Sequence, residues 1–223
     1  MRAALAFHVA VRTRFFDDDL ATAAAAGRQV VLLAAGLDSR AFRLPWPDGV
    51  RLFELDLPAV LAFKDRVLTT QGVAARCERT AVGVDLRTDW SQQLTAAGFT
   101  ATAPTAWLAE GLLVYLSAAE AARVLTAVTD LSAPGSQLAL ERGGSTASLR
   151  AEATAVSTTA RTTAAAGSVT ELWQGGLGSD TPAWLARNGW HVRTHEVGPV
   201  AASYGRAAPA SARSGFITAT RDA

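Results

Sequence analysis

The sequence predicts an α/β fold: a mostly parallel, doubly wound sheet that ends in an antiparallel C-terminal edge strand. Short apolar runs alternate along the chain with longer segments of helical pattern. The runs are continuously apolar rather than alternating, which is typical of strands buried on both faces of a parallel sheet. The last two runs are joined by a loop without a helical pattern, so we expect these two strands to pair antiparallel.

Five of the runs supply the parallel strands, and two supply the antiparallel pair. The expected parallel strands are residues 29–35 (QVVLLAA), 51–56 (RLFELD), 79–85 (RTAVGVD), 105–109 (TAWLA) and 137–141 (QLALE). The expected antiparallel strands are residues 190–197 (WHVRTHEV) and 215–220 (GFITAT), separated by the loop 198–214. No linker or repeat divides this pattern, so we expect one domain over residues 1–223.

Helical segments precede the first strand and separate most of the others. Ser117 and Glu120 have the spacing of a capping box before an apolar stretch. Asp180 or Thr181 could cap a later helix, which Gly189 would end. The expected helical segments are 3–26 (within an N-terminal helical segment 1–27), 58–70 with proline in its first turn, 90–97, 117–131, 147–166 and 182–188.

The composition excludes several classes of protein. With 49% hydrophobic and 18% charged residues, the chain is too apolar for a disordered protein. A formal net charge of +1 leaves no basic surplus for phosphate neutralisation, so nucleic acid is not an expected partner. Cys77 is the single cysteine and the three histidines are scattered, which predicts neither a disulfide nor a metal site. Without an apolar run of membrane-spanning length or a secretory signal, we expect a cytoplasmic protein with no membrane partner.

Ligands of open α/β sheets bind at the carboxyl ends of the strands, and these ends carry a distinctive set of residues. The first strand runs into a small-residue turn at Gly36, where a ligand could approach the backbone closely. Asp56 ends the second strand, twenty positions later, and could accept hydrogen bonds from a ribose diol. Asp85, followed by the apolar Leu86, suits an adenine site, and Glu110 ends the fourth strand.

Each acid also has a purely structural interpretation. Asp56 and Asp85 could cap the helices that follow them, and Glu110 could be a solvated loop acid. The recurrence of acids at successive strand ends, on one edge of one sheet, favours a shared ligand site.

The turn after the first strand distinguishes between cofactors. A dinucleotide site needs a G-x-G-x-x-G pattern so that a helix N-terminus can hold the pyrophosphate. Here Ala34 and Asp38 stand where that pattern or its relatives carry glycine, and the carboxylate of Asp38 would repel phosphate. A ligand with ribose, adenine and a cationic sulfonium, but no phosphate, fits better. These features predict S-adenosylmethionine as the cofactor.

The same residues carry a resemblance to a known family. The match runs from about residue 10 to the C-terminus. Its motifs are the segments 11–18 (VRTRFFDD), 29–44 (QVVLLAAGLDSRAFRL), 53–58 (FELDLP), 84–90 (VDLRTDW) and 107–116 (WLAEGLLVYL), with Trp173, the segment 184–190 and the segment 204–206. In this order they resemble the leucine carboxyl methyltransferase family, and most of all its bacterial branch of S-adenosylmethionine-dependent methyltransferases. The resemblance implies a Rossmann-like class I methyltransferase fold.

The resemblance also implies roles for individual residues. Gly36 would lie along the methionine part of the cofactor, Asp56 would hold the ribose hydroxyls, and Asp85 with Leu86 would frame the adenine. Glu110 would contact the methionine end or its ammonium group.

Arg12 would pair with the carboxylate of the cofactor's methionine or of the substrate; without the resemblance, Arg12 is a surface helix charge. The chain departs from the family in its N-terminal segment, which is shorter than usual. The shorter segment has three possible interpretations: the site is more open, the site is completed by another subunit, or the gene is truncated.

Methyl transfer needs alignment and exclusion of water more than a strong base. We therefore expect O-methylation of a small-molecule carboxylate or hydroxyl, such as a secondary metabolite. His8, Tyr115 and Tyr204 are the weak candidates for a catalytic group. Two other functions stay open: a catalytically silent S-adenosylmethionine-binding subunit, and a nicotinamide-dependent oxidoreductase. The oligomeric state is also open, with a homodimer as one option.

Overall fold

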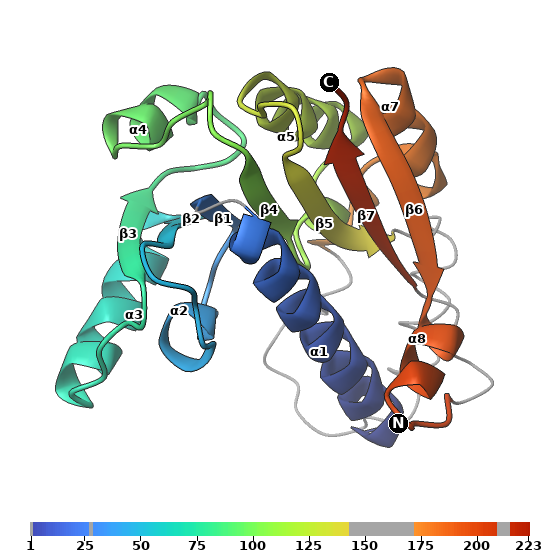
Figure 1. Cartoon of the computed structure of the whole chain (residues 1–223), viewed down its shortest axis with the longest axis horizontal. Coiled ribbons are helices and arrows are strands. Elements are labelled where there is room, and N and C mark those ends of the chain that lie inside the picture. Colours follow the sequence, from blue (N-terminus) through green and yellow to red (C-terminus); the bar gives the residue numbers. More distant parts are fainter. Residues whose placement is uncertain (1, 27–28, 143–171, 209–214) are drawn as a thin grey trace.

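The computed structural model describes residues 2–26, 29–142, 172–208 and 215–223. Within these residues seven strands form one sheet, in the order β3-β2-β1-β4-β5-β7-β6 (Figure 1). The strands are β1 (Gln29–Leu33), β2 (Arg51–Asp56), β3 (Glu78–Gly83), β4 (Thr105–Ala109), β5 (Gln137–Arg142), β6 (Trp190–Glu196) and β7 (Gly215–Arg221). Strands β1 to β5 pair in parallel, whereas β7 pairs antiparallel with both β5 and β6. The expected fold class is confirmed.

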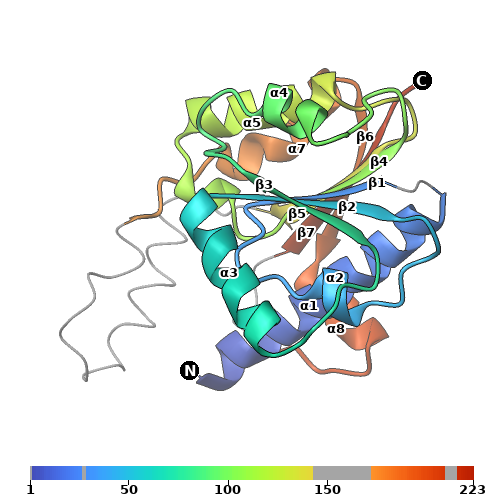
Figure 2. The ribbon, with the colours of Figure 1, turned by 90° about the vertical axis from the view of Figure 1, so that its left-hand side faces the viewer.

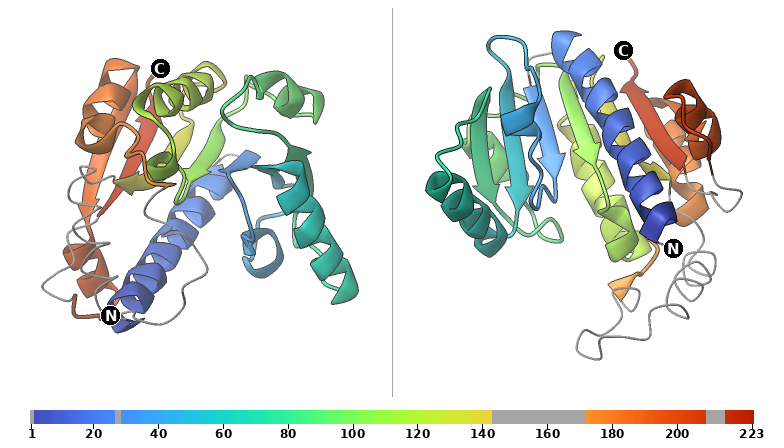
Figure 3. Two further views of the ribbon diagram at one scale, coloured as in Figure 1. Left: turned by 180° about the vertical axis from the view of Figure 1, so that it is seen from behind. Right: turned by 90° about the horizontal axis from the view of Figure 1, so that it is seen from below.

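Helices lie on both faces of the sheet, as a doubly wound fold requires (Figure 2). One face carries α4 (Ser91–Ala96), α5 (Ala118–Asp130) and α7 (Thr181–Arg187). The opposite face carries α1 (Arg2–Ala26), α2 (Arg40–Arg43) and α8 (Val197–Ser203). Helix α3 (Pro58–Thr70) runs beside β3, and the views from behind and below show α1 crossing the sheet next to β4 (Figure 3).

Two apolar clusters hold these layers together, one on each face. Because side chains alternate along a strand, β1 sends Val31 and Leu33 into the cluster under α4, α5 and α7. It sends Val30 and Leu32 into the cluster under α1. Both faces of the strand are therefore buried, which explains the continuously apolar runs in the sequence.

Several local predictions from the sequence are confirmed. Ser117 accepts a hydrogen bond from the backbone of Glu120, whose side chain accepts one from the backbone of Ser117, so the capping box of α5 is present. Pro58 lies in the first turn of α3. Gly189 follows α7 with φ +77°, a left-handed conformation that favours glycine at the end of a helix.

Other local predictions are wrong. The first strand ends at Leu33, not at residue 35, because the backbone turns into the left-handed region at Ala34 (φ 53°). The third strand ends at Gly83, which leaves Asp85 in the following loop. Asp180 occupies the N-cap position of α7, but neither it nor Thr181 caps the helix through its side chain, since Thr181 donates to the carbonyl of Gly178.

The segment after β6, expected to be a loop, begins with the short helix α8. The helix has only two buried residues, Val197 and Ala201, which lie four positions apart and pack in the cluster beneath α1. The seven residues of the helix include Gly198 and Pro199, and only two of its positions are buried. That is too few to give a helical pattern in the sequence. The four-residue helix α2 escapes prediction for the same reason. The helix expected at 147–166 lies outside the described residues.

Candidate functional site

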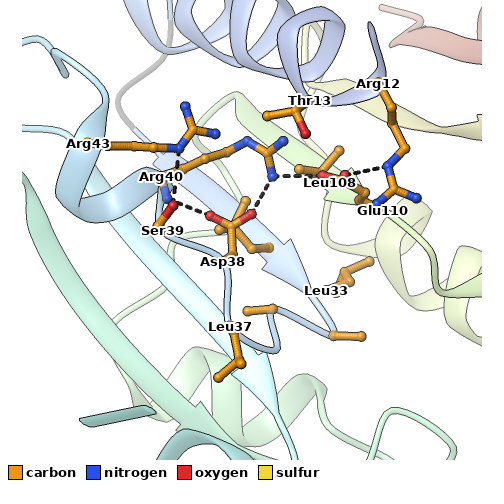
Figure 4. A pocket seen from close by; sticks show the side chains of 13 residues that line it. Arg12, Thr13, Leu33, Leu37, Asp38, Ser39, Arg40, Arg43, Leu108 and Glu110 are labelled. Atoms are coloured by element: carbon orange, nitrogen blue, oxygen red, sulfur yellow. Dashed lines mark hydrogen bonds and ion pairs between the residues drawn. The ribbon is translucent and has the colours of Figure 1, made fainter. Parts of the chain in front are cut away.

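The carboxyl ends of β1 and β4 border a pocket of about 300 Å³ (Figure 4). The strand order reverses between these two strands, which is where ligands of open α/β sheets bind. Side chains of α1, of the turn after β1, of α2 and of the segment after β4 line it. The lining residues include Arg12 and Thr13 of α1, Leu37, Asp38 and Ser39 of the turn, Arg40 and Arg43 of α2, and Glu110.

The turn after β1 and the end of β2 are joined directly. Gly36 has φ +49°, and its backbone N–H donates to the carboxylate of Asp56 over 2.6 Å. The second oxygen of Asp56 accepts from the N–H of Leu57, also at 2.6 Å. Leu57 is the N-cap of α3 and no side chain caps that helix, so the interpretation of Asp56 as a helix cap is wrong. The structure thus brings Gly36 and Asp56 together, as the ligand-site interpretation predicts.

Asp85 and Leu86 lie in the loop after β3, outside the lining of the pocket. The side chain of Arg87 hydrogen-bonds both carboxylate oxygens of Asp85, and the Arg87 backbone N–H donates to one of them. These hydrogen bonds lower the pKa of Asp85 to about 2, so it is ionised at neutral pH. Asp85 does not cap α4, whose N-cap is Trp90. Leu86 is buried.

A buried arginine that the sequence did not single out lies at the back of the pocket. The side chain of Arg40 is 3% exposed and faces three carboxylates: Asp17 of α1 at 2.7 Å, Asp38 of the turn, and Glu110 at 2.8 Å. Burial lowers the pKa of Arg40, but Asp38, Glu110 and Asp17 together raise it above its ordinary value. Arg40 therefore stays charged and links α1, the turn after β1 and the end of β4. Figure 4 shows its contacts with Asp38 and Glu110.

Glu110 and Arg12 are paired with each other. Arg12 Nε lies 2.7 Å from Glu110 Oε1, and the side chain of Glu110 is 17% exposed. The interpretation of Glu110 as a solvated loop acid is therefore wrong. Arg12 also donates from Nη1 to Glu141, at the end of β5, over 2.9 Å. Glu141 accepts in addition from the N–H of Gly111 at 2.7 Å, and His8 Nε2 lies 3.4 Å from it.

Contacts from His8 and Arg12 of α1 keep the pKa of Glu141 low in spite of its burial. Burial raises the pKa of the carboxyl, but the hydrogen bond from His8 and the charge of Arg12 hold it below its ordinary value. Glu141 is therefore ionised at neutral pH.

The three catalytic candidates lie in different places, and none lines the pocket. His8 contacts Glu141 near the carboxyl end of the sheet. Tyr115 is 39% exposed in the 3-10 turn Leu113–Tyr115. Tyr204 donates to Asp18 over 3.1 Å beside a separate hollow of about 470 Å³ between α1 and the end of α8. Burial, followed by the contact with Asp18, raises the pKa of Tyr204 to about 12, which makes it a poor general base.

Two residues of the site, Arg40 and Glu141, were not predicted from the sequence. Glu141 ends the fifth apolar run as Asp56, Asp85 and Glu110 end the second, third and fourth, so the same signal could have found it. Arg40 carries no such signal, because its carboxylate partners lie on three separate segments.

The fold agrees with the comparisons to known proteins. Residues 2–129 match the leucine carboxyl methyltransferase family. The chain belongs to this family. A relative from Parafrankia is 54% identical over 96% of this chain and 68% of its own length, and one from Streptomyces coelicolor is 46% identical over 92% and 70%. Both are named, provisionally, as S-adenosyl-L-methionine-dependent methyltransferases.

Solved structures share the fold at low sequence identity. Human N-acetylserotonin methyltransferase, solved in complex with S-adenosylmethionine, superposes with a TM-score of 0.58 at 13% identity, over 93% of this chain and 52% of that one. The expected family and the Rossmann-like methyltransferase fold are confirmed.

Within the described ranges, no helix is both long and apolar enough to cross a membrane.

Proposed function

We propose that this S-adenosylmethionine-dependent methyltransferase transfers a methyl group to an oxygen atom of a small molecule. The enzyme class and the cofactor are those expected from the sequence, and membership of the family confirms them. The observation that carries the site assignment is the contact between Asp56 and the N–H of Gly36, at the strand end beside the pocket. It places a carboxylate and a close-approach turn together, as a ribose needs.

The residues of the pocket fit the chemistry of the cofactor. Arg12 and Glu110 present a guanidinium and a carboxylate 2.7 Å apart, which complements the carboxylate and the ammonium of an amino acid. Leu37 lines the pocket with its apolar side chain 67% exposed, so a ligand could cover it. Asp38 and Glu110 are each paired with Arg40, so their charges are balanced within the protein before a ligand binds. We assign the methionine end to Arg12 and Glu110.

The adenosine end follows from the neighbouring strands. Asp56 would accept hydrogen bonds from the ribose hydroxyls, and Gly36 would leave room beside the turn. Asp85 and Leu86 would hold the adenine, with the ionised carboxylate of Asp85 accepting from its amino group.

The bound cofactor supplies a methyl group on a positively charged sulfur, which is already activated for displacement. The work of the protein is to orient the acceptor oxygen in line with that carbon and to exclude water. A carboxylate acceptor needs no base. A neutral hydroxyl would lose its proton, and His8, hydrogen-bonded to Glu141 at the end of β5, is the candidate to accept it.

Calorimetric titration with S-adenosylhomocysteine, run beside NAD, tests the cofactor assignment. We expect micromolar binding of the first and none of the second, because Asp38 and Ala34 replace the glycines that a pyrophosphate would need. Binding of NAD instead would overturn the cofactor assignment and favour the oxidoreductase alternative.

Label transfer from methyl-labelled S-adenosylmethionine to paired panels of carboxylic acids and of alcohols or phenols then tests the acceptor class. Binding of the cofactor without transfer to either panel would favour the silent binding subunit.

A further inference from the structure

Glu141 lies at the carboxyl end of β5, next to the strand whose end carries Glu110. Its side chain is 25% exposed, and it does not line the pocket at the ends of β1 and β4. Glu141 instead lines a smaller neighbouring cavity, together with Gly111 and residues of the segment after β4. Its contacts are with the residues that do line the pocket or adjoin it.

The two oxygens of Glu141 hold two separate parts of the site. Oε1 accepts from Arg12 Nη1 at 2.9 Å, while Nε of the same guanidinium faces Glu110 at 2.7 Å. Oε2 accepts from the backbone N–H of Gly111 at 2.7 Å. Gly111 directly follows Glu110 and has φ +64°, so this hydrogen bond fixes the chain just where it leaves β4 and turns.

We infer that Glu141 is a positioning residue of the cofactor site, which orients Arg12 and Glu110 together for the amino-acid end of S-adenosylmethionine. The inference rests on the proposed function. With Glu141 in place, Arg12 is held by carboxylates on two neighbouring strand ends, so its guanidinium plane is fixed before a ligand arrives. Without it, one pair would remain, and the long side chain would regain rotational freedom that binding must remove.

This role predicts an effect that depends on the ligand. S-adenosylhomocysteine contains the amino-acid group that Arg12 and Glu110 would bind, whereas 5′-methylthioadenosine has the same adenosine but lacks that group. If Glu141 acts through Arg12 and Glu110, removing its charge weakens the binding of S-adenosylhomocysteine. The binding of 5′-methylthioadenosine stays unchanged. If Glu141 had only a general structural role, removing its charge would weaken the binding of both ligands by a similar factor.

The molecule offers a matched control. Glu196 ends β6 on the same edge of the sheet and also pairs with an arginine, Arg142, at 2.9 Å. Among the described residues, that pair makes no hydrogen bond or ion pair with Arg12, Glu110 or Gly111, and it does not line the pocket. Glu196→Gln therefore removes an equivalent charge from the edge without touching the site.

The experiment compares Glu141→Gln, Glu141→Asp and Glu196→Gln with the unmodified protein by calorimetric titration. For Glu141→Gln we expect the Kd of S-adenosylhomocysteine to rise about tenfold and that of 5′-methylthioadenosine to change less than about twofold. Glu141→Asp, which keeps the charge, should recover part of the loss. Glu196→Gln should change neither Kd by more than about twofold. Thermal melting of each variant establishes that it is folded.

A second measurement covers the case in which 5′-methylthioadenosine binds too weakly to titrate. In an Arg12→Lys background, Glu141→Gln should cost clearly less affinity for S-adenosylhomocysteine than it does alone, because coupled residues are not additive. If the losses of affinity caused by Glu141→Gln and Arg12→Lys were additive, or if Glu141→Gln weakened the binding of both ligands equally, the inference would be overturned. The proposed function would still stand. Failure of the unmodified, folded protein to bind S-adenosylhomocysteine would overturn the proposed function, and the inference with it.

Discussion

The two ends of the candidate cofactor site are built in different ways. At the methionine end, Arg40 and Arg12 connect carboxylates from α1, the turn after β1 and the ends of two strands, and the side chain of Arg40 is 3% exposed. At the adenine end, Asp85 pairs with Arg87, two residues away, and both are in contact with solvent. The side chains of the methionine end are held in place before a ligand binds. The adenine end depends on local contacts that the ligand can replace. Arg40, Asp56, Asp19 and Asp85 provide tests of this difference, from the largest expected effect to the smallest.

The largest expected effect is on stability, at Arg40. Arg40→Met removes the charge that Asp17, Asp38 and Glu110 surround, and leaves them facing one another in a partly buried site. Loss of one partner of a buried ion pair costs about 3–5 kcal/mol of the free energy of unfolding. Denaturant unfolding measures the change. Arg43→Met is the control, because Arg43 also pairs with Asp17 but is 38% exposed, and it should cost less than about 1 kcal/mol. Equal costs for both variants would show that the methionine end is not held together by Arg40.

The next effect is on affinity, at the contact between the two ends. Asp56→Ala removes the carboxylate that would bind the ribose and that accepts from Gly36. With one or two charge-assisted hydrogen bonds lost, at roughly 1.5–3 kcal/mol each, the Kd of S-adenosylhomocysteine should rise at least about tenfold. Because S-adenosylhomocysteine and 5′-methylthioadenosine share the ribose, the Kd of 5′-methylthioadenosine should rise by the same factor. Unchanged affinity in a folded variant would remove Asp56 from the site.

Asp19 provides a contrast within α1, the helix that supplies Arg12 and Asp17 to the methionine end. Burial raises the pKa of Asp19 to about 6 from an ordinary value of 3.8, and no hydrogen bond or ion pair to another described residue is assigned to it. The folded state thus disfavours the ionised form, so this side chain lowers stability progressively as the pH rises from about 4 to about 6. Asp19→Asn should then stabilise the protein above pH 6.

The full shift corresponds to about 3 kcal/mol, which partial solvent access reduces to about 1–2 kcal/mol. Denaturant unfolding at pH 4.5 and pH 7.5 measures it, and the gain should appear mainly at the higher pH. Asp18→Asn is the control: Asp18 pairs with Arg14 and Tyr204, so its loss should not stabilise the protein at either pH. A gain for Asp19→Asn that does not depend on pH would contradict the assignment of the effect to ionisation.

The difference between the two ends also explains what the sequence could predict. The strands, the antiparallel pairing and the capping box follow from residues close together in the chain. So does the set of acids at the strand ends, because each acid follows its own apolar run. Arg40 could not be found in this way, since its partners Asp17 and Glu110 are 23 and 70 positions away and meet it only through the fold. Helix α8 escaped because two buried positions give no periodicity.

The smallest expected effect is at the adenine end. Asp85 is already paired with Arg87, so a ligand's amino group would gain only part of a charge-assisted hydrogen bond there. We expect Asp85→Asn to raise the Kd of S-adenosylhomocysteine about three- to fivefold, a cost of about 1 kcal/mol or less. Because the pKa of Asp85 lies near 2, this carboxylate should contribute no pH dependence to binding between pH 5 and pH 8. Asp85→Asn should weaken the binding of 5′-methylthioadenosine by the same factor, whereas Arg12→Ala should weaken the binding of S-adenosylhomocysteine alone. If both substitutions affected the two ligands equally, the division of the site into a prearranged methionine end and a locally built adenine end would fail.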